Sequence, residues 1–187
     1  MKQTIFVITL MLVTLQAYAQ QNQTQSDRKG FVVGAMVGVG HLSLSGNTAN
    51  TSDGFGISLP NLKAGYMINP DLAIMLSTQG LSYEESGQDR SISGLVPSLQ
   101  YWIKPNLWIN GGIGLAMDVP AFYTDNTGDQ CRIDFGAAIL LSSGYEVYRK
   151  GSFSIDLQGI IQAGQIESDN GNREAFAVMT GVGFNFN

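Results

Sequence analysis

Apolar and polar residues alternate with a period of two along most of this chain. Over 107–119, one set of alternate positions is mainly aliphatic, while the other holds small or polar residues. The same alternation runs through 31–40, 133–147, 153–163 and 176–186, and no helical period of 3.6 competes with it. The pattern predicts β-strands with one apolar face and one mixed face.

Three further strands are expected at 54–68, 72–83 and 90–103, where the alternation is weaker. Pro60 and Pro97 lie inside two of them, and each proline removes a ladder donor, which predicts a bulge or a local break. The total is eight strands of roughly 10 to 14 residues, a length typical of strands that span a bilayer.

Two nearly identical nonamers, at 66–74 and 101–109, each read as a strand end, a tight turn containing proline and a strand start. The connections between strands alternate strictly between short and long. The short ones are 69–71, 104–106 and 148–151, and the long ones are 45–53, 84–89, 120–132 and 166–172. The expected fold is therefore all-β, an eight-stranded antiparallel up-and-down barrel with every short turn at one end.

The composition indicates which face of the barrel points outward. Charged residues make up only 13% of the chain, and the mixed face carries Gly, Ala and Ser rather than the Lys and Glu of a soluble surface. Aromatic side chains gather on the apolar face beside the short turns and the C-terminus, as in the girdle of a membrane barrel. The predicted girdle consists of Tyr66, Tyr101, Tyr145, Phe184 and Phe186. The pattern favours a transmembrane β-barrel whose apolar face contacts lipid.

The N-terminus has the features of a secretory signal peptide. Lys2 precedes an apolar run at 5–13, and Ala17-Tyr18-Ala19 provides a small-x-small cleavage site. The predicted organisation is a signal peptide at 1–19, a flexible polar lead-in at 20–29 and a barrel domain at 30–187. Loss of Lys2 leaves 9 basic against 15 acidic residues, a net charge of 9 − 15 = −6, which argues against a nucleic-acid partner. Cys131, the single cysteine, excludes an internal disulfide and is expected to be a tolerated loop thiol.

With its strand count, girdle, signal peptide and aromatic C-terminus at 183–186, the chain resembles the small eight-stranded outer-membrane proteins of the OmpX and OmpA barrel type over about residues 30–187. The resemblance implies a place in the bacterial outer membrane, contact with its lipid and lipopolysaccharide, and insertion by the barrel-assembly machinery. It also implies that the short turns face the periplasm and the four long loops face outward. The chain departs from the family by ending in Asn187 rather than an aromatic residue.

The mixed face is expected to line the barrel interior. Eight strands leave an interior about wide enough for side chains, so a hydrogen-bonded plug is favoured over an open pore. Lys63 is expected to pair with Glu146 or Asp156, because a buried charge needs a partner. The predicted polar network consists of Lys63, Asn110, Asp134, Glu146, Asp156 and Gln158.

His41 and Ser43 share the lipid-facing side of the first strand near its outer rim, with Asp53 as the nearest acidic residue. This His-x-Ser pair is similar to the arrangement in outer-membrane lipid A deacylases, where His activates Ser. That family carries the pair on a later strand and uses a glutamate, whereas an interfacial His beside a loop Ser is the simpler interpretation.

No cofactor is expected, and no metal site, because one His and one Cys far apart in sequence cannot form one alone. The favoured function is a non-enzymatic structural or surface-interaction protein presenting four extracellular loops to a ligand or surface partner that the sequence does not name. A narrow passive channel is the alternative, and a lipid A acyl hydrolase using His41 and Ser43 is a more distant one.

Overall fold

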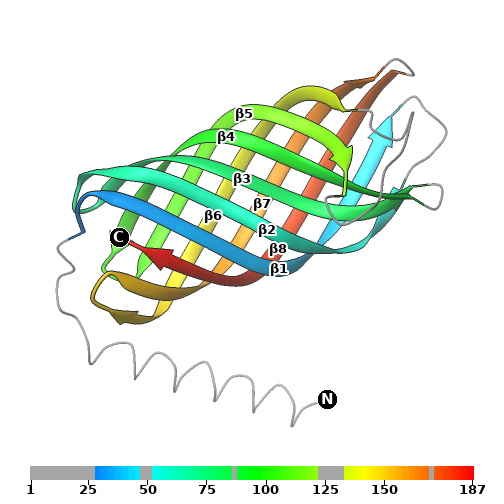
Figure 1. Cartoon of the computed structure of the whole chain (residues 1–187). Helices are drawn as coiled ribbons and strands as arrows, with labels where there is room; N and C mark the ends of the chain where they lie inside the picture. The colour runs from blue at the N-terminus through cyan, green and yellow to red at the C-terminus, as the bar shows by residue number, and fades with distance from the viewer. Residues whose placement is uncertain (1–27, 47–51, 86–87, 122–132, 169–170) are drawn as a thin grey trace, which may run out of the picture.

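The computed structural model describes residues 28–46, 52–85, 88–121, 133–168 and 171–187. They form eight antiparallel strands in chain order, and β1 pairs with β8 to close a barrel (Figure 1). The strands are β1 (Phe31–Gly46), β2 (Ser52–Asn69), β3 (Leu72–Glu85), β4 (Gln88–Lys104), β5 (Leu107–Pro120), β6 (Asp134–Lys150), β7 (Phe153–Ser168) and β8 (Gly171–Phe186). The predicted eight-stranded up-and-down barrel is confirmed.

Three predicted features lie outside the described residues: the signal peptide at 1–19, most of the lead-in at 20–29, and Cys131. Within the part of the chain that the structure describes, no helix has the length and hydrophobicity that a membrane-spanning helix requires.

The strands are longer than the alternation predicted, at 14 to 18 residues. At the end opposite the short turns, the β3–β4 ladder continues to Glu85 paired with Gln88. Here both faces carry polar residues, so the hydrophobic periodicity fades while the backbone hydrogen bonds continue. Alternation therefore marks the apolar band of a strand rather than its full length.

The apolar face points outward, as the composition indicated. Phe31 is 78% exposed and Ile113 is 72% exposed, whereas Val32 and Trp108, on the other face, are almost completely buried. A continuous exposed aliphatic wall of this kind is typical of a surface that contacts lipid.

The three short turns lie at one end of the barrel together with the C-terminus, and we call this the turn end and the opposite one the loop end (Figure 1). Each turn is preceded by a bulge of one extra residue: Ile68 in β2, Ile103 in β4 and Val147 in β6. The repeated nonamer is thus the sequence of a bulged turn, and the bulge gives neighbouring hairpins the same local twist.

Backbone hydrogen bonds also join neighbouring strands around this rim, beyond or beside the ends of their ladders. The amide of Met67 donates to Gly30 O at 2.9 Å, and the amide of Trp102 donates to Asp71 O at 2.8 Å. The amide of Glu146 donates to Asn106 O at 2.7 Å, and the amide of Asn187 donates to Ser152 O at 2.9 Å. The side chains of Met67, Trp102 and Glu146, each next to its bulge, all enter the barrel.

The two prolines act differently. Leu59 and Pro60 together face Val37, because the β1–β2 register shifts between Met36 and Gly38, so the bulge expected at Pro60 is present. Pro97 stays in register opposite Leu76, but the β4–β5 ladder is interrupted between Leu95 and Ser98 without a register shift, so the local break expected at Pro97 is present on that side.

Leu141 lies near the middle of β6 and is 58% exposed on the outer wall. We expect Leu141→Arg to reduce the folding free energy in a bilayer by about 2–4 kcal/mol, because a charge at mid-membrane depth is poorly solvated. Ile133→Arg, at the loop-end rim beside the same strand, should cost only about 0–1 kcal/mol. Denaturant titrations of both variants refolded into lipid vesicles measure the difference, and equal costs would contradict burial of Leu141 in hydrocarbon.

Candidate functional site

A buried carboxylate organises the interior near the turn end. Asp156 on β7 is fully buried and accepts three hydrogen bonds. Trp108 Nε1 and Asn185 Nδ2 donate to its Oδ2 at 2.9 and 3.0 Å, and Gln158 Nε2 donates to its Oδ1 at 2.8 Å. The donors come from β5, β8 and β7, so this one carboxylate links three strands and has the donors that a buried anion needs.

Lys63 enters the same layer from β2 but does not pair as the sequence predicted. Its Nζ donates to Gln100 Oε1 at 3.4 Å and lies 4.0 Å from the centroid of the Trp108 ring. No salt bridge joins it to Asp156 or Glu146 among the described residues. The expected direct ion pair is therefore not formed. Lys63 instead makes a cation–π contact with the Trp108 ring and a hydrogen bond to the side-chain carbonyl of Gln100.

The Trp108 ring occupies space that the neighbouring strand β6 leaves free. A Cβ on Gly144 of β6 would collide with the atoms of this ring. The absence of a side chain at Gly144 therefore lets the indole pass over β6 and reach Asp156 on β7.

A second carboxylate, Glu146, organises the mouth at the turn end. Arg149 binds it with two hydrogen bonds, from Nε at 2.8 Å and from Nη2 at 2.9 Å, and Trp102 Nε1 donates to Oε1 at 3.0 Å. Arg149 Nη1 also donates to Asn187 Oδ1 at 2.8 Å, which connects this carboxylate to the last residue of the chain. The bidentate geometry is the strong form of a guanidinium–carboxylate pair.

Arg28 completes this mouth from outside the strands. Its Nη2 lies 3.4 Å from Glu146 Oε1 and also donates to Pro105 O, and its guanidinium lies 4.7 Å from the centroid of the Trp102 ring. Burial lowers the pKa of Arg28, and the nearby Glu146 carboxylate acts in the opposite direction. The predicted flexible lead-in is thus fixed at its end, which the sequence did not indicate, because the contacts join residues 77 and 118 positions apart.

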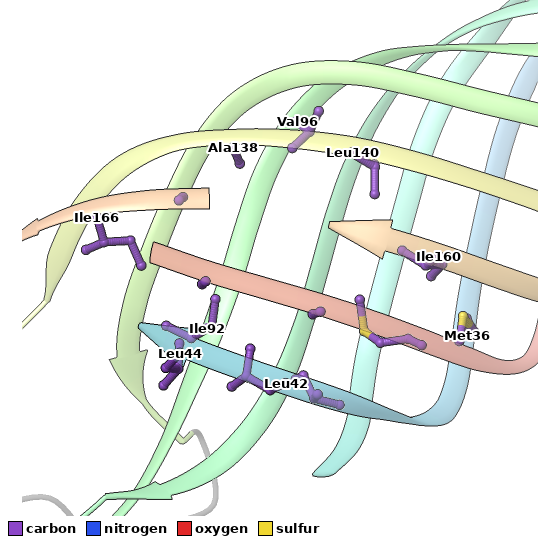
Figure 2. Packing of buried hydrophobic residues seen from close by; sticks show 14 residues of the cluster. Met36, Leu42, Leu44, Ile92, Val96, Ala138, Leu140, Ile160 and Ile166 are labelled. Carbon is purple, nitrogen blue, oxygen red and sulfur yellow. The ribbon is translucent and has the colours of Figure 1, made fainter. Parts of the chain in front are cut away.

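The middle and loop half of the interior holds a large apolar cluster beside buried polar side chains such as Asn61, Gln79 and Gln162, whereas the sequence interpretation emphasised only the polar residues. Aliphatic and Met side chains from several strands meet across the barrel, as Figure 2 shows. The cluster comprises Met36, Leu42, Leu44, Leu81, Ile92, Val96, Ala116, Ala138, Leu140, Ile160, Ile166, Ala175, Ala177 and Met179. We call it the apolar layer, and it lies between the charged clusters at the two ends.

A third carboxylate lies at the loop end. Asp118 accepts from Arg90 Nε at 2.9 Å, from Arg173 Nη1 at 3.1 Å and from the Tyr83 hydroxyl at 3.0 Å. The Asp118 carboxylate is almost completely buried, so its charge needs these paired donors in place of water. Asp134, predicted as a network member, is only half-buried and lies opposite Asp118 in the β5–β6 register.

The other predicted residues lie as follows. Asn110 is buried, and its Nδ2 donates to Ser142 Oγ at 3.4 Å. Of the proposed girdle, Tyr145 is half-buried, and the other members are exposed on the outer wall: Tyr66, Tyr101, Phe184 and Phe186. Phe31 and Tyr66 meet edge to face with their ring centroids 5.3 Å apart.

On the outer wall near the loop end, the structure brings His41 and Asp53 together, with Nε2 and Oδ1 3.0 Å apart. Ser43 is opposite Asp53 in the β1–β2 register. Within the described residues, no hydrogen bond joins the Ser43 hydroxyl to His41. The geometry contains the acid–imidazole pair but not the activated nucleophile of a hydrolase.

Across the described ranges, no group of three His, Cys, Asp or Glu side chains is arranged to hold a metal ion. The interior carboxylates instead receive hydrogen bonds from arginine, tryptophan, tyrosine and amide groups.

Similar barrels exist among solved structures. Ail, the attachment invasion locus protein of Yersinia pestis, is 16% identical to this chain, with a TM-score of 0.53 over 85% of this chain and 100% of that one. Neisserial surface protein A is 19% identical, with a TM-score of 0.54 over 84% and 96% of the two chains. This chain has the fold of the small eight-stranded outer-membrane barrels. The structural neighbours confirm the predicted resemblance to the OmpX and OmpA barrel type and the transmembrane class of the fold.

No protein-family model matches the sequence, and a search of curated proteins found no match. A further structure of Ail, in complex with the heparin analogue sucrose octasulfate, has a TM-score of 0.54 at 16% identity, over 85% of this chain and 100% of that one. At these identities the likeness shows the fold alone.

We expect Gly144→Ala to destabilise the barrel by about 1–3 kcal/mol, because the added methyl group displaces the Trp108 ring from Asp156. Gly159→Ala is the matched control on the adjacent strand, since a Cβ at Gly159 meets no atom within 4 Å, and it should change stability by less than about 0.5 kcal/mol. Urea unfolding followed by tryptophan fluorescence measures both. A Gly144→Ala variant as stable as the control would show that the ring is not confined.

Proposed function

We propose that this protein is a non-enzymatic surface protein of the bacterial outer membrane, whose closed barrel anchors four extracellular loops. The observation that carries the proposal is the filled interior. The apolar layer occupies the middle and loop half, and carboxylate–guanidinium clusters occupy both mouths, at Glu146 and Asp118. Ions would have to displace paired charges at either end and then pass the apolar layer, beside which the buried polar side chains, such as Gln79 and Gln162, carry no charge.

The orientation proposed is that of small outer-membrane barrels, with the turn end in the periplasm and the loop end outside. The exposed aromatic residues near the turn end, such as Tyr66 and Phe186, support a position at the level of the lipid head groups. The outer wall would contact lipid and lipopolysaccharide, and the aromatic C-terminal strand supports insertion by the barrel-assembly machinery after a signal peptide at 1–19 is removed.

Planar-bilayer recording tests the closed interior. We expect refolded protein to give no discrete conductance steps, because the apolar layer excludes hydrated ions. A Leu81→Gly, Leu140→Gly double variant removes two buried side chains from this layer and serves as the comparison. Discrete steps from the unaltered protein, in preparations whose folding is checked by heat-modifiable gel migration, would favour the narrow passive channel instead.

One observation favours that channel as the second candidate. In the loop half of the barrel, buried amide atoms of Gln79 and Gln162 have no hydrogen-bond partner among the described residues. Such groups are commonly satisfied by internal water, and a chain of water would provide a narrow polar path. The surrounding apolar layer makes the closed barrel the better-supported proposal.

The His41–Asp53 pair is the one observation in favour of the acyl hydrolase. Both side chains are substantially exposed at the rim, and the pair is also explained as an interfacial contact, since His41 lies edge-on to the exposed Phe55 ring with centroids 5.0 Å apart. Without a hydrogen bond between His41 and Ser43, the non-enzymatic interpretation is preferred.

The charge of the loop end indicates the chemistry of the unidentified partner. Among the described side chains, this end carries seven carboxylates and two guanidinium groups, and Asp118 binds both guanidiniums, those of Arg90 and Arg173. The carboxylates are Asp53, Glu84, Asp89, Asp118, Asp134, Glu167 and Glu174. An acidic rim favours cationic partners and disfavours polyanions.

We therefore expect no binding of sucrose octasulfate, in contrast to its complex with Ail. Isothermal titration calorimetry in a neutral detergent at low salt measures this directly. An oligolysine peptide should bind in the same buffer and lose affinity as salt increases, and a Glu167→Gln, Glu174→Gln variant should bind it more weakly. Measurable octasulfate binding would show that the rim charge does not select the partner.

A further inference from the structure

The Arg28 guanidinium occupies an enclosed pocket at the turn end. Three groups from different parts of the chain form its walls: the Trp102 ring of β4, the Glu146 carboxylate of β6 and the carbonyl of Pro105 in the turn between β4 and β5. The side chains of Arg28 and Glu146 are 2% and 5% exposed. An aromatic face, an anion and a carbonyl acceptor together match the flat, cationic, donor-rich shape of a guanidinium.

The walls of this pocket are held in place without Arg28. Glu146 is oriented by Trp102 Nε1 at 3.0 Å and by the two hydrogen bonds from Arg149. The backbone bonds from the Trp102 amide to Asp71 and from the Glu146 amide to Asn106 fix both residues in the rim. Removal of the Arg28 side chain would therefore leave a formed cavity rather than a collapsed one.

Arg28 is also an imperfect occupant. Its Nε is buried and has no hydrogen-bond partner within the described part of the chain, and its Nη2 lies 3.4 and 3.5 Å from the two oxygens of Glu146. A buried donor without an acceptor costs free energy. Arg28 lies only three residues before the start of β1, and this attachment restricts the orientation of its guanidinium in the pocket. A separate ligand would not have this restriction.

We propose that the turn end of the barrel is a binding site for a guanidinium group, occupied in cis by Arg28, and that it accepts an arginine side chain from a peptide when the lead-in is displaced. The site goes beyond the proposed anchoring function, because it lies at the opposite end from the loops. In the proposed orientation the incoming peptide would come from the periplasm.

Chemical rescue tests the site. Arg28→Ala is expected to lower the midpoint of thermal unfolding, read from heat-modifiable gel migration, by about 5 °C. Millimolar methylguanidinium should restore the midpoint saturably and shift the tryptophan emission, because Trp102 is one of only two tryptophans. Urea at the same concentrations has a similar shape without the charge and should not restore it.

Two controls make the result specific. Lys29→Ala changes the adjacent, exposed cation and should show no saturable response to methylguanidinium. In the Arg28→Ala background, Trp102→Leu removes the ring that faces the guanidinium, so the response should be lost. If Arg28→Ala does not refold, Arg28→Gln keeps a polar side chain that is shorter by the guanidinium, and it is titrated in the same way.

A non-saturable response, or an equal response in the unaltered protein and the Lys29→Ala variant, would overturn the proposal, since it would reflect a general salt effect. An Arg28→Ala variant that is destabilised but insensitive to methylguanidinium would also overturn it, because the pocket would then not persist without the Arg28 side chain. These outcomes do not depend on whether the barrel conducts, so the site and the anchoring function are tested separately.

Discussion

Closing eight strands into a barrel leaves an interior only about as wide as the side chains that point into it. Each inward residue must therefore fit whatever faces it from across the barrel, in volume and in polarity. The Trp108 ring fits because Gly144, its partner on the neighbouring strand β6, has no side chain, and its Nε1 is one of three donors to the buried Asp156 carboxylate. The outer wall, in contrast, is constrained only to be apolar.

The same arrangement recurs at the two mouths. Glu146 and Asp118 each receive two arginines and one aromatic donor, Trp102 Nε1 in one case and the Tyr83 hydroxyl in the other. Two guanidinium groups more than neutralise the charge of one buried carboxylate, so each cluster carries a net positive charge. Between these clusters the side chains of the apolar layer need no hydrogen-bond partners, and the two arginine-paired carboxylates lie at the mouths, where water is nearest.

The alternation and the repeated nonamer predicted the strands, their order and the turn end, because these depend on residues close together in sequence. Contacts across the barrel were not predictable in this way. The tilt of the strands decides which inward residues share a level, so Lys63 meets Gln100 rather than either acid. Arg28 looked like part of a polar leader, and nothing in the sequence indicated its contact with Glu146. The partner of His41 was different, because Asp53 was already the nearest acidic candidate in the sequence, and the β1–β2 register explains why the two side chains meet.

The rim of backbone hydrogen bonds at the turn end has a consequence for the order of assembly. The bonds lie beside the turn-end termini of the β1–β2, β3–β4, β5–β6 and β7–β8 ladders, from Gly30 and Met67 to Ser152 and Asn187, and none joins the two strands on either side of one short turn. Two strands joined by a short turn would therefore leave these rim groups unpaired if they formed alone. Circular permutants opened within a turn would therefore weaken two adjacent hairpins at once, and the long connections at the other end are the better places to cut the chain.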